Sequence, residues 1–181
     1  RRLLIDLIEQ CVEDERYEYY LQVMKELQVP VRYTWTNTML ENADLTDEYC
    51  NWVTQISEDG FNQILVNNDL MEEYIRTQYS TYPIVSSTTK RITNIDSFNE
   101  ELKKDYHIVV VDYDFNNRWD YLKQITNPGR CELLINPLCN PQCPLRKRHY
   151  NVISRIQKGE YVDDGLIHEC PAQKRLAHEI K

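Results

Sequence analysis

Glycine is scarce in this sequence, with only 4 glycines among 181 residues. Neither the GxGxxG pattern of dinucleotide-binding folds nor the GxxxxGK[ST] pattern of phosphate-binding loops occurs, and both patterns need glycine so that the backbone can approach a phosphate closely. The sequence therefore gives no support to nucleotide binding through a glycine-rich loop. HExxH and a recognisable Ser/His/Asp arrangement are also missing, so the usual zinc-peptidase and serine-hydrolase signatures offer no assignment.

Long apolar runs and an excess of positive charge are missing as well. No run is long enough to span a bilayer, and we see no signal peptide, so we expect no membrane association. The net charge of −8 gives no global electrostatic reason for binding a phosphate backbone. A chain of this size does not need disulfides, so the six cysteines predict a reducing, cytoplasmic compartment.

Apolar and charged residues occur in the proportions of a packed globular protein, at 41% and 28%. Because the sequence opens on Arg1 and Arg2 without a methionine, we expect one α/β domain over residues 1–181 that is a fragment of a larger barrel.

Five segments rich in β-branched and aromatic residues alternate with helical patterns. The predicted strands begin near positions 31, 61, 83, 107 and 131, and spacings of roughly 22–30 residues are typical of βα units. Helices are predicted over 1–28, from Thr46, from Asn68, from a Ser97–Glu100 capping box, near 119–125 and over 145–157. This order predicts a parallel sheet, either open and doubly wound or closed as a barrel. A full (β/α) barrel needs about 250 residues, so we expect a partial TIM-type barrel.

Polar residues follow each predicted strand, where ligands bind in parallel α/β folds. Lys90 and Asp112 are the best candidates, because an amine and a carboxylate can serve acid–base or anion-binding roles. The alternative for each strand-end residue is that it caps the following helix.

Closely spaced cysteines follow the fifth predicted strand, where prolines stiffen the chain. Thiolates held this way can bind a soft metal, and we take Cys139 and Cys143 as ligands, with Cys170 as a third. Cys131, His149 or His168 could be the fourth. Four sulfurs favour an iron–sulfur cluster or zinc, whereas three sulfurs and an imidazole favour zinc. The alternative is that these are buried free thiols.

A basic run, Arg146-Lys147-Arg148, opens the helix predicted over 145–157. The simpler interpretation is a solvated helix face. The other is a local contact with an anion or a nucleic acid, although the net charge does not favour a large footprint.

A set of motifs lies in segments 82–90, 109–112 and 131–136 and in the residues that follow them, Cys139, Cys143, Pro144, Arg146 and His149. Together these motifs resemble the collagenase-like peptidase family, which includes bacterial RNA and ubiquinone hydroxylation factors. The resemblance covers roughly residues 80–150. It implies a (β/α) barrel and, as in several members, a four-cysteine iron–sulfur cluster. Carried over to this sequence, it makes Cys139, Cys143 and Cys170 ligands, with Cys131 as a further candidate. The cysteines here lie closer together than in those members.

Three functional hypotheses follow. The first is an enzyme, or an enzyme component, with a cysteine-ligated metal or cluster that carries out an oxidative or hydroxylating modification. The second is a binding or assembly module with a structural zinc. The third is a metal-independent hydrolase or lyase that uses Asp112 and Lys90.

Overall fold

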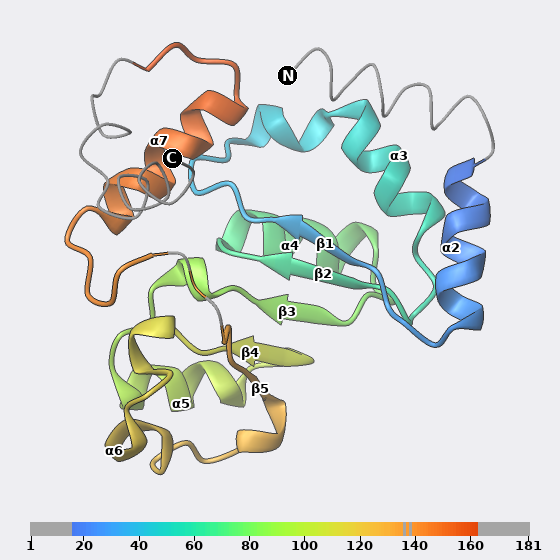
Figure 1. Cartoon of the computed structure of the whole chain (residues 1–181). Coiled ribbons are helices and arrows are strands. Elements are labelled where there is room, and N and C mark those ends of the chain that lie inside the picture. The colour runs from blue at the N-terminus through green and yellow to red at the C-terminus, as the bar shows by residue number, and fades with distance from the viewer. Residues whose placement is uncertain (1–15, 136, 138, 163–181) are drawn as a thin grey trace, which may run out of the picture. The chain divides into compact units, whose positions relative to one another are not determined.

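The computed structural model describes residues 16–135, 137 and 139–162. These residues form two compact units, one made of 16–35 and Leu40–Ile84, the other of Thr36–Met39 and 85–162. Within these described ranges, five short strands alternate with helices (Figure 1), and strands pair in parallel within each unit. The predicted parallel α/β fold is confirmed. Cys11, Cys170, His168 and His178 lie outside the described residues.

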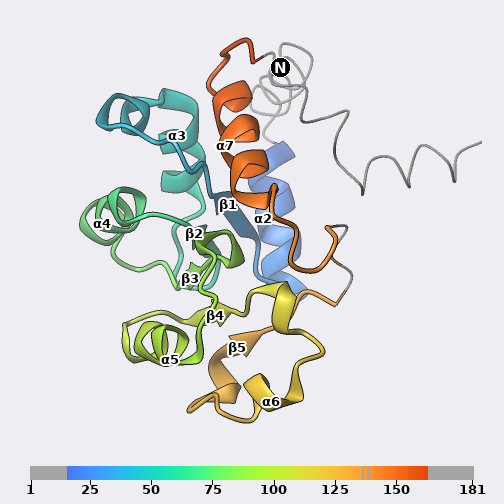
Figure 2. The ribbon, with the colours of Figure 1, turned by 90° about the vertical axis from the view of Figure 1, so that its left-hand side faces the viewer.

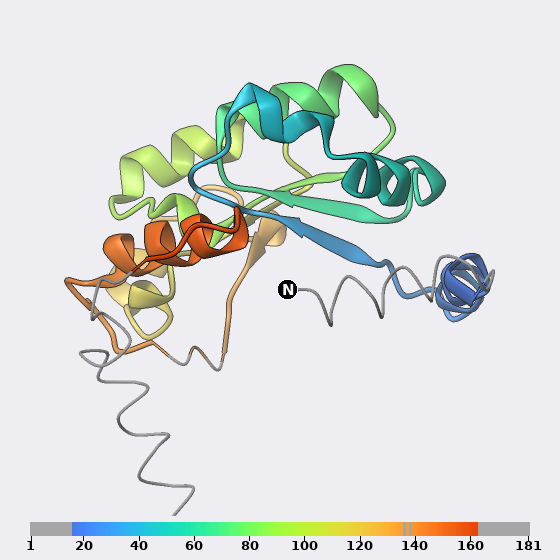
Figure 3. The same cartoon turned by 90° about the horizontal axis from the view of Figure 1, so that it is seen from above.

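The first unit contains one parallel strand pair and three α-helices. Its elements are α2 (Arg16–Glu26), β1 (Arg32–Trp35), α3 (Glu48–Ile56), β2 (Gln63–Val66) and α4 (Asp69–Gln78). In the register of the pair, Tyr33 lies opposite Ile64 and Trp35 opposite Val66. Helices α3 and α4 lie on the same side of this pair in both Figure 2 and Figure 3. Ile64 and Val66 are fully buried, so β2 carries the core of this unit.

Side-chain caps start helices α3 and α4 of this unit. Asn68 accepts a hydrogen bond from the amide of Met71, as predicted. The predicted Thr46 cap is wrong, because the carboxylate of Asp47 accepts from the amide of Cys50 instead. Thr46 closes the preceding 3-10 helix (Asn42–Thr46), where its hydroxyl donates to the carbonyl of Ala43.

The second unit holds a three-stranded parallel arrangement with β4 between β3 and β5. Its elements are β3 (Ile84–Ser86), α5 (Ile95–Lys103), β4 (Ile108–Val110), α6 (Trp119–Leu122), β5 (Cys131–Glu132) and α7 (Arg146–Gln157). Val109 is fully buried, as expected for a strand covered on both faces. Helix α5 turns Phe98 and Leu102 inward, where both are buried. The predicted capping box is wrong: Asn94 caps α5, and Ser97 lies within the helix.

The fifth strand is shorter and more exposed than its sequence predicts. Only Cys131 and Glu132 pair with β4, and the following Leu133, Leu134 and Ile135 are 42%, 38% and 87% exposed. The side-chain amide of Asn116 donates to the carbonyl of Leu134, which takes the place of a strand partner. The sequence predicts a strand over 131–136, but the pairing of β5 with β4 ends at Glu132.

The segment after β1 belongs to the second unit because it is bonded to α7. The amide of Thr38 donates to the hydroxyl of Ser154 at 2.9 Å, and the Thr38 hydroxyl donates to Asn151 at 2.9 Å. On α7, Val152 is buried, whereas Ile153 and Ile156 are 40% and 43% exposed. Within the described ranges, no helix is long and apolar enough to cross a membrane.

Candidate functional site

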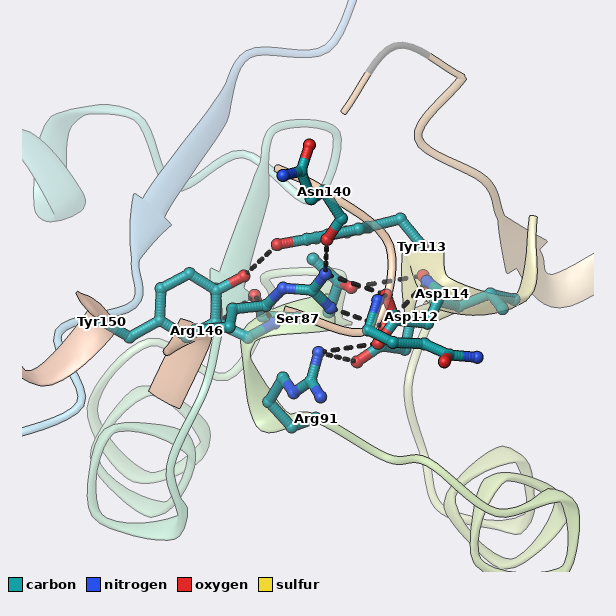
Figure 4. Close-up of polar contacts among 12 residues, drawn as sticks. Ser87, Arg91, Asp112, Tyr113, Asp114, Asn140, Arg146 and Tyr150 are labelled. Carbon is teal, nitrogen blue, oxygen red and sulfur yellow. Dashed lines mark hydrogen bonds and ion pairs between the residues drawn. The ribbon is translucent and has the colours of Figure 1, made fainter. Parts of the chain in front are cut away.

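Two arginines and two aspartates meet just beyond the carboxyl ends of β3 and β4 (Figure 4). Asp112 and Asp114 follow β4, Arg91 follows β3, and Arg146 is the first residue of α7. Arg91 Nη1 lies 3.2 Å from Asp112 Oδ2 and 3.2 Å from Asp114 Oδ2. Arg146 lies 3.4 Å from Asp112 Oδ1 through Nη1 and 2.8 Å from Asp114 Oδ1 through Nη2. We call these four residues the ionic cluster.

The ionic cluster is withdrawn from solvent. The exposed side-chain fractions of Arg146, Asp112 and Asp114 are 0%, 1% and 7%, and Arg91 is the most accessible member at 25%. Burying charges is costly unless they are paired and hydrogen-bonded, and here two positive groups face two negative ones. Arg91 also adopts a left-handed backbone conformation with φ 59°, which is uncommon outside glycine. The fold thus places opposite charges together at a substantial energetic cost.

The two aspartates respond differently to this environment. Burial raises the pKa of Asp112 above its ordinary value, against the opposing effect of the neighbouring backbone amide and both arginines. Burial also disfavours the charged form of Asp114, but hydrogen bonds from Arg146 and from the amide of Gln142 outweigh it and lower the pKa of Asp114. Asp114 is therefore the firmly ionised partner of Arg146.

The ionic cluster holds the loop that carries the predicted metal ligands. Arg146 Nη2 donates to the carbonyl of Asn140 at 2.7 Å, and the amide of Gln142 donates to Asp114 Oδ1 at 2.7 Å. Cys139 and Cys143 flank these two attachment points. Because both attachments use buried charged groups, they are stronger than ordinary loop hydrogen bonds. The loop over 139–145 is therefore fixed onto the strand ends rather than only packed beside them.

Two tyrosines complete the surroundings of Arg146. The guanidinium carbon lies 4.1 Å from the ring centroid of Tyr113, and the Tyr113 and Tyr150 hydroxyls are 2.6 Å apart (Figure 4). Burial, together with hydrogen bonds to Cys139 and Tyr150, raises the pKa of Tyr113. The Cys139 thiol is thus connected to the ionic cluster through the side chain that stacks on Arg146.

The predicted cysteine ligands are only partly brought together. Cys139 and Cys143 are half-buried free thiols on the fixed loop. Cys131 lies on β5, where its thiol donates to the carbonyl of Asn127 at 3.4 Å, and burial raises its pKa. Among the described residues, no group of three His, Cys, Asp or Glu side chains could hold a metal ion. Since Cys170 is not described, the predicted ligand set stays a prediction.

Lys90 belongs to a separate buried cluster on α5 and β3. Its amine lies 2.8 Å from Glu101 Oε1 and donates to the Tyr106 hydroxyl at 2.7 Å, while Ser86 donates to Glu101 Oε1 at 2.7 Å. Burial opposes ionisation of Glu101, but hydrogen bonds from Lys104, Lys90 and Ser86 prevail and lower its pKa to about 2. The two predicted catalytic residues thus take part in different clusters of the same unit.

Sequence reasoning missed the arginines. The interpretation of Arg146 as part of a solvated face is wrong, because this side chain has no exposed area, while Lys147 and Arg148 are exposed. One signal was available: a positive residue in the first turn of a helix opposes the helix dipole, so its presence suggests a specific partner. The left-handed conformation that turns Arg91 toward the aspartates has no sequence signature. The predicted nucleic-acid contact now depends on Lys147 and Arg148.

Two known proteins are similar to this chain, although no family model matches it. An uncharacterized protease of Methanocaldococcus jannaschii, MJ1657, is 22% identical over 130 residues, which cover 67% of this chain and 38% of that protein. The solved structure of the U32 peptidase Mk0906 superimposes with a TM-score of 0.59 at 15% identity, covering 83% of this chain and 63% of that one. The chain thus spans little more than a third of the curated relative's length. These similarities confirm that the chain resembles the collagenase-like peptidases, family U32, in sequence and in fold.

Proposed function

We propose that this chain contributes the cysteine-bearing strand-end site of a U32-type enzyme, with a metal ion or an iron–sulfur cluster held by the loop over 139–143. The observation that carries the proposal is the attachment of this loop to the ionic cluster, through Arg146 to Asn140 and through Asp114 to Gln142. A buried network of charges is a costly way to order a loop. Ligands that must hold a fixed geometry benefit from such support.

The described residues supply two of the ligands that such a group needs. Structural zinc takes four ligands and iron–sulfur clusters take four, mostly cysteines. Cys139 and Cys143 would be two of them, Cys170 the third, and Cys131 or a histidine the fourth. The Tyr113 side chain, which interacts with Cys139, would help to orient one thiolate. When bound, an iron–sulfur cluster would supply electron transfer, and zinc would supply a structural clamp or a Lewis acid.

The reaction we propose is an oxidative or hydroxylating modification, as in the hydroxylation factors of the resembled family, carried out in a reducing compartment such as the cytoplasm. Exposed Lys147 and Arg148 would allow a local contact with an anionic substrate. Because the relatives are longer than this chain, the complete activity would need residues beyond those seen here.

A second candidate function is peptide-bond hydrolysis, which the names of both relatives suggest. The raised pKa of Asp112 favours it, since a carboxyl that titrates closer to neutrality is a better general acid or base. Burial counts against it: a side chain 1% exposed between two arginines does not reach a substrate without movement of Arg91. We therefore assign Asp112 a positioning role first.

The deciding experiment measures metal and acid-labile sulfide in protein purified without oxygen. We expect close to one cluster or one zinc per chain, and loss of the metal in Cys139→Ser and Cys143→Ser. Cys50→Ser is the matched control, because Cys50 is a half-buried thiol on α3 of the other unit. Iron with sulfide supports the redox enzyme, and zinc alone supports a structural module. Folded protein with no metal overturns the proposal and leaves hydrolysis, tested by Asp112→Asn.

A further inference from the structure

A largely apolar pocket of about 270 Å³ lies between α6 and β5 in the second unit. We call it the α6 pocket. Its lining includes Val111, Trp119, Leu122, Lys123, Ile125 and Cys131. Val111 is fully buried, whereas Trp119 is 70% exposed, so the pocket extends from the core to the surface. Neither the ionic cluster nor the loop over 139–143 takes part in it.

The size of the α6 pocket selects small molecules. An engineered apolar cavity of about 150 Å³ accepts benzene. A volume of about 270 Å³ is nearly twice as large, which suits a bicyclic aromatic group or a short alkyl chain. An exposed tryptophan and several aliphatic side chains on the lining favour an aromatic occupant, through stacking and burial of apolar area.

One charged residue on the lining indicates which charge the ligand should carry. Lys123 is exposed and forms no ion pair or hydrogen bond through its amine with any described residue. The other lining residues named above are uncharged. A ligand with an apolar body in the pocket and a negatively charged group at its mouth would therefore satisfy both features.

We propose that the α6 pocket binds a small aromatic carboxylate, with its ring system against Leu122 and Ile125 and its carboxylate paired with Lys123. This inference does not depend on the proposed metal site. It places Cys131 in the lining of the α6 pocket, so that a histidine rather than Cys131 would complete the proposed metal site.

The test is a calorimetric titration of the full chain with 2-naphthoate. A ligand of this size in a mostly apolar pocket gives a Kd between about 0.1 and 1 mM. Lys123→Met should weaken binding by about two- to five-fold, because an ion pair at an exposed site is weak. Leu122→Trp should fill the pocket and weaken binding at least ten-fold. Lys147→Met, an exposed lysine on α7, is the matched control and should bind as the unmodified chain does.

A second measurement keeps the proposal testable if Leu122→Trp fails to fold. Alkylation of Cys131 by iodoacetamide, followed by mass spectrometry, should slow in the presence of 2-naphthoate, while alkylation of Cys50 should not change. Absence of saturable binding, or unchanged alkylation of Cys131, would overturn the pocket. Equal affinity for 2-naphthamide, or binding unaffected by Lys123→Met, would overturn the assignment of a carboxylate.

Discussion

Replacing Arg146 by methionine tests whether the ionic cluster is what holds the loop over 139–145. The substitution keeps a long apolar stem but removes every donor of the guanidinium. It deletes the contacts to Asp112 at 3.4 Å, to Asp114 at 2.8 Å and to the carbonyl of Asn140 at 2.7 Å. Arg91 then remains as the one arginine contacting both aspartates.

The expected loss is large because the partners stay buried after the arginine has gone. Breaking a buried ion pair by removing one member costs about 3–5 kcal/mol, most of it the penalty of an uncompensated buried charge. The raised pKa of Asp112 lets that group take up a proton and recover part of the cost, so we expect the lower end, about 3 kcal/mol. Arg146→Lys should lose about half as much, because lysine keeps the charge but cannot bridge two carboxylates and a carbonyl.

Urea unfolding of the whole chain, followed by circular dichroism, measures this difference. Lys147→Met is the control, since the neighbouring lysine is exposed and should change the free energy of unfolding by less than about 0.5 kcal/mol. The double variant with Asp114→Asn should lose less than the sum of the single variants, because both act on one contact. A loss below about 1 kcal/mol for Arg146→Met, with an unchanged dependence on urea, would refute the role of the ionic cluster in holding the loop over 139–145.

Three further predictions concern the support of the second unit. Glu101→Gln should lower the free energy of unfolding near neutral pH. In the unmodified chain, the contribution of Glu101, about 3 kcal/mol, should vanish as pH falls from about 4.5 to about 2, because its folded pKa lies below the ordinary value. An acid-unfolding curve that is identical in Glu101→Gln and in the unmodified chain would contradict this. Asn94→Ala should cost about 1 kcal/mol in thermal unfolding through loss of the cap on α5, and Ser97→Ala, at an exposed position in the same helix, would serve as the comparison. Phe98→Ala should cost about 3–5 kcal/mol, since this ring is fully buried, and a value under 1 kcal/mol would mean that α5 does not pack as described.

The parallel fold could be predicted because its signals are local. The continuous apolar run before Asp112 and the recurrence of βα spacing are set by which residues are buried, and β4 occupies the expected place. Asn68 could be identified as a cap because amide side chains bond the first free amides of a helix. The predicted caps at Thr46 and Ser97 are wrong because several neighbouring residues have side chains that can cap a helix. The backbone conformation then decides which of them does so, and here it is Asp47 for α3 and Asn94 for α5.

The ionic cluster could not be predicted because it joins residues far apart in the chain. Arg146 is 34 positions from Asp112, and its burial depends on the path of the loop between them. The sequence predicts Lys90 and Asp112 as polar residues that follow strands, which is where they lie, but it says nothing of their partners. The exposed end of the fifth predicted strand has a similar cause. An apolar strand pattern shows that a segment prefers burial, and Leu133 to Ile135 are exposed in this unit despite it.

The burial of the ionic cluster indicates that its residues hold the loop in place and do not themselves react with a substrate. A group that reacts with a substrate must be reached by it, and Asp112 and Arg146 are almost completely enclosed. A group that fixes a loop must instead be enclosed, because a charged hydrogen bond is strongest where water cannot compete for it. The hydrogen-bond partners of the cluster are backbone groups of the loop, at Asn140 and Gln142, which lie between two accessible cysteines. If this chain carries out a reaction at the strand ends, its reactive groups are therefore the side chains that the cluster positions, with Cys139 and Cys143 foremost, rather than the buried aspartates themselves.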